Sequence, residues 1–77
     1  MPTILLLNGF RFFFYSNENN EPVHIHIEKG DAIGKVWLEP IEPGYFIDFS
    51  PKQIRDILKI IDAHVVEFIN SWNEYFS

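Results

Sequence analysis

Cysteine is absent from the 77-residue sequence, so neither a disulfide bond nor a thiolate site can contribute to its fold or chemistry. Basic residues are scarce as well: six Lys and Arg stand against 11 Asp and Glu, and the formal net charge is −5. Non-specific nucleic-acid binding depends on neutralising phosphates with Lys and Arg. The charge therefore argues against a nucleic-acid partner, although it leaves room for a local basic patch.

Long apolar runs are also missing. The run Ile4-Leu5-Leu6-Leu7 is too short for a secretory signal and far too short to span a bilayer, and no basic residue precedes it. The sequence has no glycine-rich phosphate loop, no Ser-His-Asp spacing and no EF-hand loop. We therefore expect a cytoplasmic protein with no membrane segment and no cofactor, and the lack of cysteine suits that compartment.

Aromatic residues, by contrast, are abundant: the chain has eight Phe, three Tyr and two Trp. A chain of this length forms one domain, and a short chain buries a smaller fraction of its surface than a long one. Its core must therefore be dense, and aromatic side chains can supply that density. We expect residues 1–77 to form a single domain.

Two β-hairpins are predicted in the first half of the chain. Asn8-Gly9 accepts the positive φ angles of a tight turn and predicts a hairpin over residues 3–15. A polar loop over residues 16–22 follows. Lys29-Gly30 then predicts the turn of a second hairpin over residues 23–39, and a bulged three-residue turn fits equally well.

The lengths of these two turns set the expected strand register. With two-residue turns, Thr3 lies opposite Phe14 in the first hairpin, and His26 lies opposite Ile33 in the second. Because side chains alternate between faces, the register also decides which residues share a face.

The second half of the chain predicts a connector and one long helix. Residues 40–49 form a connector or a short fifth strand, with a turn at Glu42-Pro43-Gly44. Ser50, Pro51 and Gln53 are typical of a helix start. Apolar residues then recur at three- and four-residue steps: Ile54, Leu58, Ile61, Val65, Phe68, Trp72 and Phe76. The sequence thus predicts an α+β fold, an antiparallel four- to five-stranded β-meander with one long C-terminal helix, 51–76, packed on one face.

Residues 22–28, Pro-Val-His-Ile-His-Ile-Glu, alternate apolar and polar side chains, as a half-buried strand does. One face of the predicted sheet collects apolar residues and should meet the helix: Leu5, Leu7, Phe10, Phe12, Phe14, Val23, Ile25, Ile27, Ala32, Val36 and Leu38. The opposite, open face has a mixed composition: Arg11, Phe13, Tyr15, His24, His26, Glu28, Ile33, Lys35, Trp37 and Glu39.

The open face suggests a surface for a protein partner. Exposed apolar patches usually mark contact sites, and aromatic residues with Arg are enriched at the centres of interfaces. We expect the partner to contact this face through six residues: Arg11, Phe13, Tyr15, His24, His26 and Trp37. A purely structural role is the alternative, because cross-strand pairs stabilise a sheet by roughly 0.2–1 kcal/mol each.

His24 and His26 have two chemical alternatives. They could bind a metal ion, but Glu28 extends their row in a line rather than converging with it, and His64 is expected across the sheet. They could also serve as acid and base in a small ribonuclease, with Arg11 or Lys35 holding a phosphate and Tyr15 or Trp37 stacking on a base.

Neither alternative leads us to assign a catalytic residue or a metal ligand. The candidates for catalysis are His24, His26, Arg11 and Tyr15, and the candidates for a metal are the two histidines. Both histidines could instead be polar strand residues that fix a turn or a partner surface by hydrogen bonds.

Three motifs carry a family resemblance: Arg11-Phe-Phe-Phe-Tyr-Ser-Asn-Glu18, then Pro22 leading into the two histidines, then Trp37-Leu-Glu-Pro40. Together with the helix they resemble the small bacterial "domain of unknown function 4160" family over nearly the whole chain. Val23 stands where that family commonly has a second proline. The resemblance implies a short bacterial protein paired with another small protein in toxin–antitoxin-like gene pairs, and it implies no activity.

Overall fold

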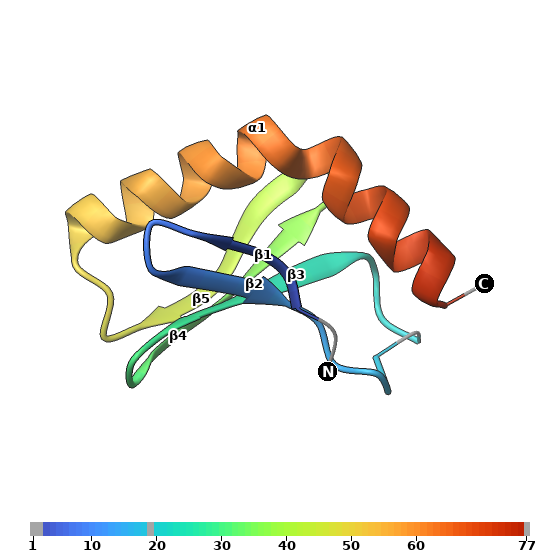
Figure 1. The fold of residues 1–77 in the computed structure, drawn as a ribbon, viewed down its shortest axis with the longest axis horizontal. Helices are drawn as coiled ribbons and strands as arrows, with labels where there is room; N and C mark the ends of the chain where they lie inside the picture. The colour runs from blue at the N-terminus through green and yellow to red at the C-terminus, as the bar shows by residue number, and fades with distance from the viewer. Residues whose placement is uncertain (1–2, 19, 77) are drawn as a thin grey trace.

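The computed structural model describes residues 3–18 and 20–76. Five strands form one antiparallel sheet in the order of the sequence: β1 (Thr3–Leu7), β2 (Phe10–Phe13), β3 (His24–Lys29), β4 (Ala32–Leu38) and β5 (Ile41–Ile47). The helix α1 (Pro51–Tyr75) follows and crosses one face of the sheet (Figure 1). The predicted α+β meander is therefore confirmed, and the fifth strand exists.

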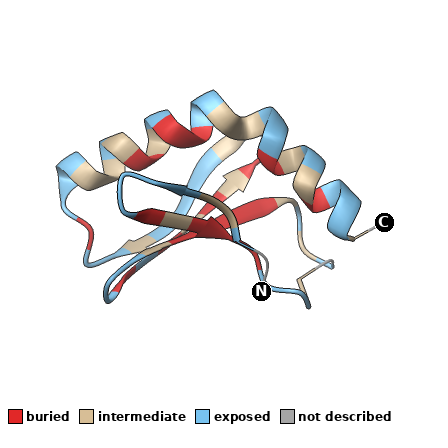
Figure 2. Ribbon diagram, viewed as in Figure 1, coloured by how far each residue is buried: buried red, intermediate tan, exposed pale blue. Residues whose placement is uncertain are grey.

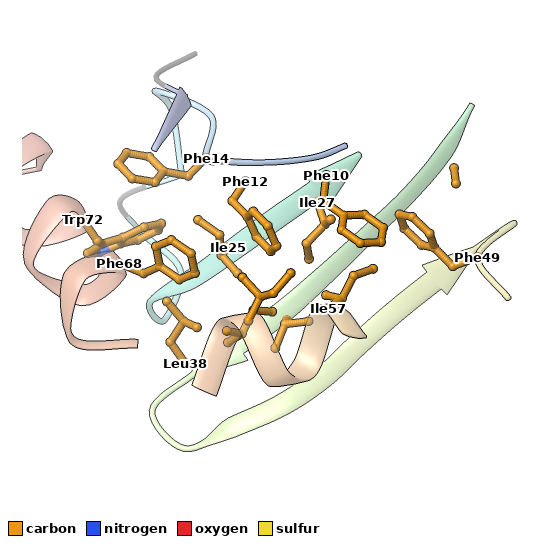
Figure 3. Close-up of a cluster of buried hydrophobic side chains, with 14 residues drawn as sticks. Phe10, Phe12, Phe14, Ile25, Ile27, Leu38, Phe49, Ile57, Phe68 and Trp72 are labelled. Atoms are coloured by element: carbon orange, nitrogen blue, oxygen red, sulfur yellow. The ribbon is translucent and has the colours of Figure 1, made fainter. Parts of the chain in front are cut away.

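The core lies between α1 and the facing side of β2, β3 and β4 (Figures 2 and 3). Eight of the residues assigned to that side are buried: Phe10, Phe12, Phe14, Ile25, Ile27, Ala32, Val36 and Leu38. Phe12 is fully buried and stacks on Phe68 of the helix, with ring centroids 5.5 Å apart. Leu7, which was expected in the same layer, is exposed on the edge strand β1.

The start of α1 follows from its first residues. The Ser50 hydroxyl accepts a hydrogen bond from the backbone N–H of Gln53 at 3.1 Å, and the Gln53 side chain accepts one from the N–H of Ser50 at 2.9 Å. The buried line of the helix includes Ile57 and Ile60, whereas Leu58 of the predicted stripe lies at its margin. Within the described residues, no helix has the length and apolar character that crossing a membrane requires.

The register of the first hairpin differs from the prediction at its open end. A bulge between Thr3 and Leu5 places Thr3 opposite Phe13 rather than Phe14. Thr3 therefore moves to the sheet face that the helix does not cover, where its hydroxyl accepts a hydrogen bond from Arg11 Nε at 2.8 Å.

The second predicted turn was one residue too early. Lys29 pairs with Ala32, so the turn is Gly30-Asp31, and Gly30 supplies its positive φ of 59°. His26 consequently pairs with Lys35 rather than Ile33. The register moves by two residues, and each side chain keeps its expected face.

The third turn also differs from the prediction. Leu38 pairs with Ile41, so the turn is Glu39-Pro40, and residues 42–44 lie inside β5 rather than in a turn. A bulge at Gly44 separates two paired segments of β5. Because β5 is an edge strand, it tolerates Pro43, which has no N–H to donate to a neighbour.

The stacked pair in the core gives a stability prediction. Replacing Phe12 by Ala should lower the free energy of unfolding by about 3–5 kcal/mol, because the cavity would lie at the centre of the sheet–helix interface. Denaturant unfolding measures this change. Leu6→Ala in the same hairpin is the control, because Leu6 is 70% exposed and its loss should cost no more than about 0.5 kcal/mol. Similar losses in both variants would contradict this description of the core.

Candidate functional site

The two histidines of β3 are buried, and the expectation that they lie on an open face is wrong. His24 is 0% exposed and His26 is 6% exposed. The ring of His24 packs against Trp37 at 5.4 Å and against Trp72 of α1 at 4.8 Å. The end of the helix and the loop between β2 and β3 lie beside the start of β3 (Figure 1).

Aromatic rings also enclose His26. Phe13 stacks on its imidazole at 5.5 Å, and Tyr15 meets it edge-on at 4.8 Å. Phe13 is itself buried, at 3% exposure, so it adds nothing to an exposed patch, contrary to prediction. Period-two alternation placed these residues on the correct face, but it could not show that a loop covers that face.

The polar partner of both histidines is Glu18, in the loop between β2 and β3. His26 Nε2 lies 3.0 Å from both carboxylate oxygens of Glu18, and His24 Nε2 lies 3.0 Å from Oε1. One ligand atom from each residue can be chosen so that all three lie within 4.8 Å of one another. We call these residues the Glu18–His24–His26 cluster.

The hydrogen-bond partners define the tautomers of the two rings. His24 Nδ1 lies 2.8 Å from the carbonyl oxygen of Pro22, which can only accept, so Nδ1 carries the proton. In a neutral imidazole, His24 Nε2 then holds a lone pair, and this buried atom has no hydrogen-bond partner despite its short distance to Glu18. His26 has the other tautomer, in which Nε2 carries the proton and donates it to the Glu18 carboxylate.

The local electrostatics favour a carboxylate beside a neutral imidazole. Burial raises the pKa of Glu18, but the hydrogen bond from His26, the close approach of His24 and the hydrogen bond from the backbone N–H of Tyr15 outweigh it, so this pKa lies below its ordinary value. Burial lowers the pKa of His26, and the nearby Glu18 offsets this only in part. Near neutral pH, therefore, Glu18 is ionised and His26 is neutral.

The other predicted site residues are engaged elsewhere. Arg11 pairs with Glu28 at 2.8 Å, and its guanidinium lies 4.2 Å from the centre of the Phe13 ring. Glu28 is thus a partner of Arg11 and not a third member of the histidine row. His64 lies on α1 and contacts Glu67 at 3.3 Å.

Lys35 is paired in the same way. Its Nζ lies 2.7 Å from Glu21 and 4.4 Å from the centre of the Trp37 ring. Both cations that sequence reasoning placed on this face therefore already have carboxylate partners.

Exposed apolar side chains gather farther along the same face, on β4 and β5. Ile33, Tyr45 and Ile47 are 41%, 42% and 48% exposed, and we call them the β4–β5 patch. Ile33 lies on the face expected for it, whereas Tyr45 and Ile47 were not expected there, because the predicted turn into β5 lay at residues 42–44. Glu18 was also not predicted, since a loop residue has no periodicity that links it to a strand.

A protein-family model with the description "Domain of unknown function (DUF4160)" matches residues 9–73. The match spans the Glu18–His24–His26 cluster and the β4–β5 patch. No curated protein and no solved structure matches the chain.

The tautomers of the cluster can be tested directly. In the metal-free protein near neutral pH, His24 should be the Nδ1–H tautomer and His26 the Nε2–H tautomer, because each proton has a fixed acceptor. Long-range ¹H–¹⁵N correlation spectra of the imidazoles distinguish these forms. His64, on the helix surface, is the reference ring, and equal tautomer averaging in all three histidines would contradict the described geometry.

Proposed function

Because the chain belongs to the DUF4160 family, whose description states no activity, we propose a function from its surface: it is a protein-interaction module that binds a small protein on the sheet face opposite α1. The observation that carries this proposal is the β4–β5 patch, which is apolar and exposed on the face without a helix. Contiguous exposed apolar side chains of this kind mark contact sites more often than isolated ones do.

The strand register makes the patch contiguous. Ile33 pairs with Ile47, and Tyr45 lies two residues from Ile47 on the same face. Lys35, opposite Tyr45, borders the patch on the side of the histidines. An apolar centre with a charged rim is the usual composition of a protein interface.

The proposed interface differs from the one that the sequence suggested. Phe13, His24 and His26 are buried and offer a partner little surface. Tyr15 is 39% exposed, and Arg11 and Trp37 are half-buried. Tyr15, Arg11 and Trp37 lie at the edge of the proposed interface, and its centre lies on β4 and β5.

The proposed partner is the second small protein of a toxin–antitoxin-type pair, and the proposed compartment is a bacterial cytoplasm. The support for both is the resemblance of the sequence motifs, and the lack of cysteine suits a reducing compartment. The net charge of −5 favours a partner with a basic surface around its apolar contact.

The alternative, a small ribonuclease centred on His24 and His26, has weaker support. A phosphate would have to displace Glu28 from Arg11 or Glu21 from Lys35. His24 is also closed off by two tryptophan rings. General acid–base catalysis needs the catalytic ring within hydrogen-bond reach of the substrate.

A charge-pair variant tests the interface. The partner is first captured from the host of the protein, then purified and titrated against the chain by calorimetry. The double variant Ile33→Lys/Ile47→Glu should weaken the partner's affinity by a factor of about ten or more. The variant loses the favourable free energy of burying two isoleucine side chains, and burying either charge in the interface is unfavourable. Opposite charges across the strand pair keep the sheet itself stable.

Val66→Lys is the matched control, since Val66 is 68% exposed on the helix, and its change should leave affinity at the wild-type value. Thermal unfolding confirms that each variant is folded. Wild-type affinity in the double variant, or an equal loss in the Val66 variant, would place the contact elsewhere.

A further inference from the structure

We propose that Glu18, His24 and His26 bind one divalent transition-metal ion, of which Zn²⁺ is the representative. The proposal concerns a different part of the same sheet face from the β4–β5 patch and does not depend on the proposed partner. It rests on the donor geometry of the cluster and, independently, on the buried lone pair of His24.

Two of the three donor-to-donor distances are close to those around a tetrahedral metal ion. Zinc binds imidazole nitrogen and carboxylate oxygen at about 2.0–2.2 Å, so neighbouring donors around a tetrahedral ion lie about 3.3 Å apart. In the structure, Nε2 of His24 and Nε2 of His26 each lie 3.0 Å from Oε1 of Glu18. One donor atom from each of the three residues lies within 4.8 Å of the other two, so the side chains would have to adjust around a bound ion.

The second observation is the unsatisfied nitrogen of His24. This side chain is completely buried, and its Nε2 has no hydrogen-bond partner, although it lies beside a carboxylate oxygen. A lone pair facing an anion in a buried position is unfavourable, and the cost of leaving a buried polar atom unpaired is about 1–3 kcal/mol. A cation between the two atoms would remove both problems at once.

The opposite ring nitrogen of His24 is arranged as in known metal sites. A metal-binding histidine usually donates its other N–H to a carboxylate or a backbone carbonyl, which fixes the ring and its tautomer. His24 Nδ1 makes such a bond to the carbonyl of Pro22 at 2.8 Å. His24 therefore needs no rearrangement to bind an ion, whereas His26 has to move its proton from Nε2 to Nδ1.

The donor set indicates the class of metal. Two imidazoles with one carboxylate suit Zn²⁺, Fe²⁺ and Co²⁺, while Mg²⁺ and Ca²⁺ prefer sites built from oxygen. Three protein ligands leave a fourth position for water.

A bound ion would join three parts of the fold. Glu18 comes from the loop between β2 and β3, both histidines come from β3, and His24 contacts Trp72 near the end of α1. An ion that binds the folded chain but not the unfolded chain raises the free energy of unfolding. The increase grows with the logarithm of the ratio of the free ion concentration to Kd. Metal binding should therefore be visible in the unfolding temperature.

The first experiment titrates ZnCl₂ into the chelator-treated, untagged full chain by calorimetry, with MgCl₂ as the comparison. We expect one Zn²⁺ per chain and no heat of binding with Mg²⁺. At a hundredfold excess of Zn²⁺ over Kd, the unfolding temperature should rise on the order of 10 °C. Absence of Zn²⁺ binding to the folded wild-type chain would overturn the proposal.

Glu18→Gln and Glu21→Gln are the matched variants. Both glutamates lie in the same loop, but Glu21 pairs with Lys35 and not with the histidines. Loss of even an outer partner of a metal ligand lowers affinity about 10- to 100-fold, so Glu18→Gln should weaken Zn²⁺ binding at least that much. Glu21→Gln should bind as the wild type does, and an equal affinity in all three proteins would sink the proposal.

Imidazole spectra distinguish a metal from a proton at the cluster, and they need no variant. On adding Zn²⁺, His26 should change from the Nε2–H to the Nδ1–H tautomer, His24 should keep its tautomer, and the His64 signals should stay unchanged. Co²⁺ should give the intense visible absorption of a four-coordinate site. If His24 Nε2 carries a proton that Zn²⁺ does not displace, the proton is the occupant and the metal assignment fails.

Discussion

One helix has to cover a five-stranded sheet, and this constraint shapes the rest of the molecule. Neighbouring strands lie about 4.8 Å apart, so the outer strands of such a sheet are about 19 Å apart, whereas a helix with its side chains is about 10–12 Å wide. The helix therefore buries the central strands β2, β3 and β4 and leaves both edges less covered. On the helix-facing side, Leu7 of β1 is therefore exposed and Phe46 of β5 is only partly buried.

The face opposite the helix has no second layer among the described residues, and its side chains are covered locally instead. Arg11 lies over the ring of Phe13, and Lys35 lies over the ring of Trp37, so the methylene stems and charges of both cations shield apolar surface. At the start of β3, the loop that contains Glu18 covers the histidines. The β4–β5 patch remains apolar and exposed on this face, and so does Leu6 on the opposite edge strand.

The alternation of side chains made most of the fold predictable. Both the Gly30-Asp31 turn and the predicted Lys29-Gly30 turn place His24 and His26 on the same face, because moving a two-residue turn by one position moves the register by two. The helix start was equally predictable, since the groups that stabilise it lie within four residues.

The candidate site was less predictable, because its contacts depend on segments without periodicity. Glu18 reaches the histidines from a loop, and Trp72 reaches His24 from the far end of the chain. Alternation assigns a residue to a face but does not say whether a loop closes over that face. The same limit explains why His24 was expected to be open and is buried.

The Glu18–His24–His26 cluster and the β4–β5 patch are connected through Lys35. On the face opposite the helix, Phe13, His26, Lys35 and Tyr45 form one row across β2, β3, β4 and β5. Lys35 also bonds to Glu21, in the loop that carries Glu18. An ion that orders this loop would hold Glu21, and hence Lys35, at the border of the β4–β5 patch. Glu21→Gln breaks this connection while leaving the three metal donors and the β4–β5 patch unchanged, and the double variant on β4 and β5 changes the patch while leaving the donors and the Glu21–Lys35 pair unchanged. The two sites can therefore be separated experimentally even though one lysine lies between them.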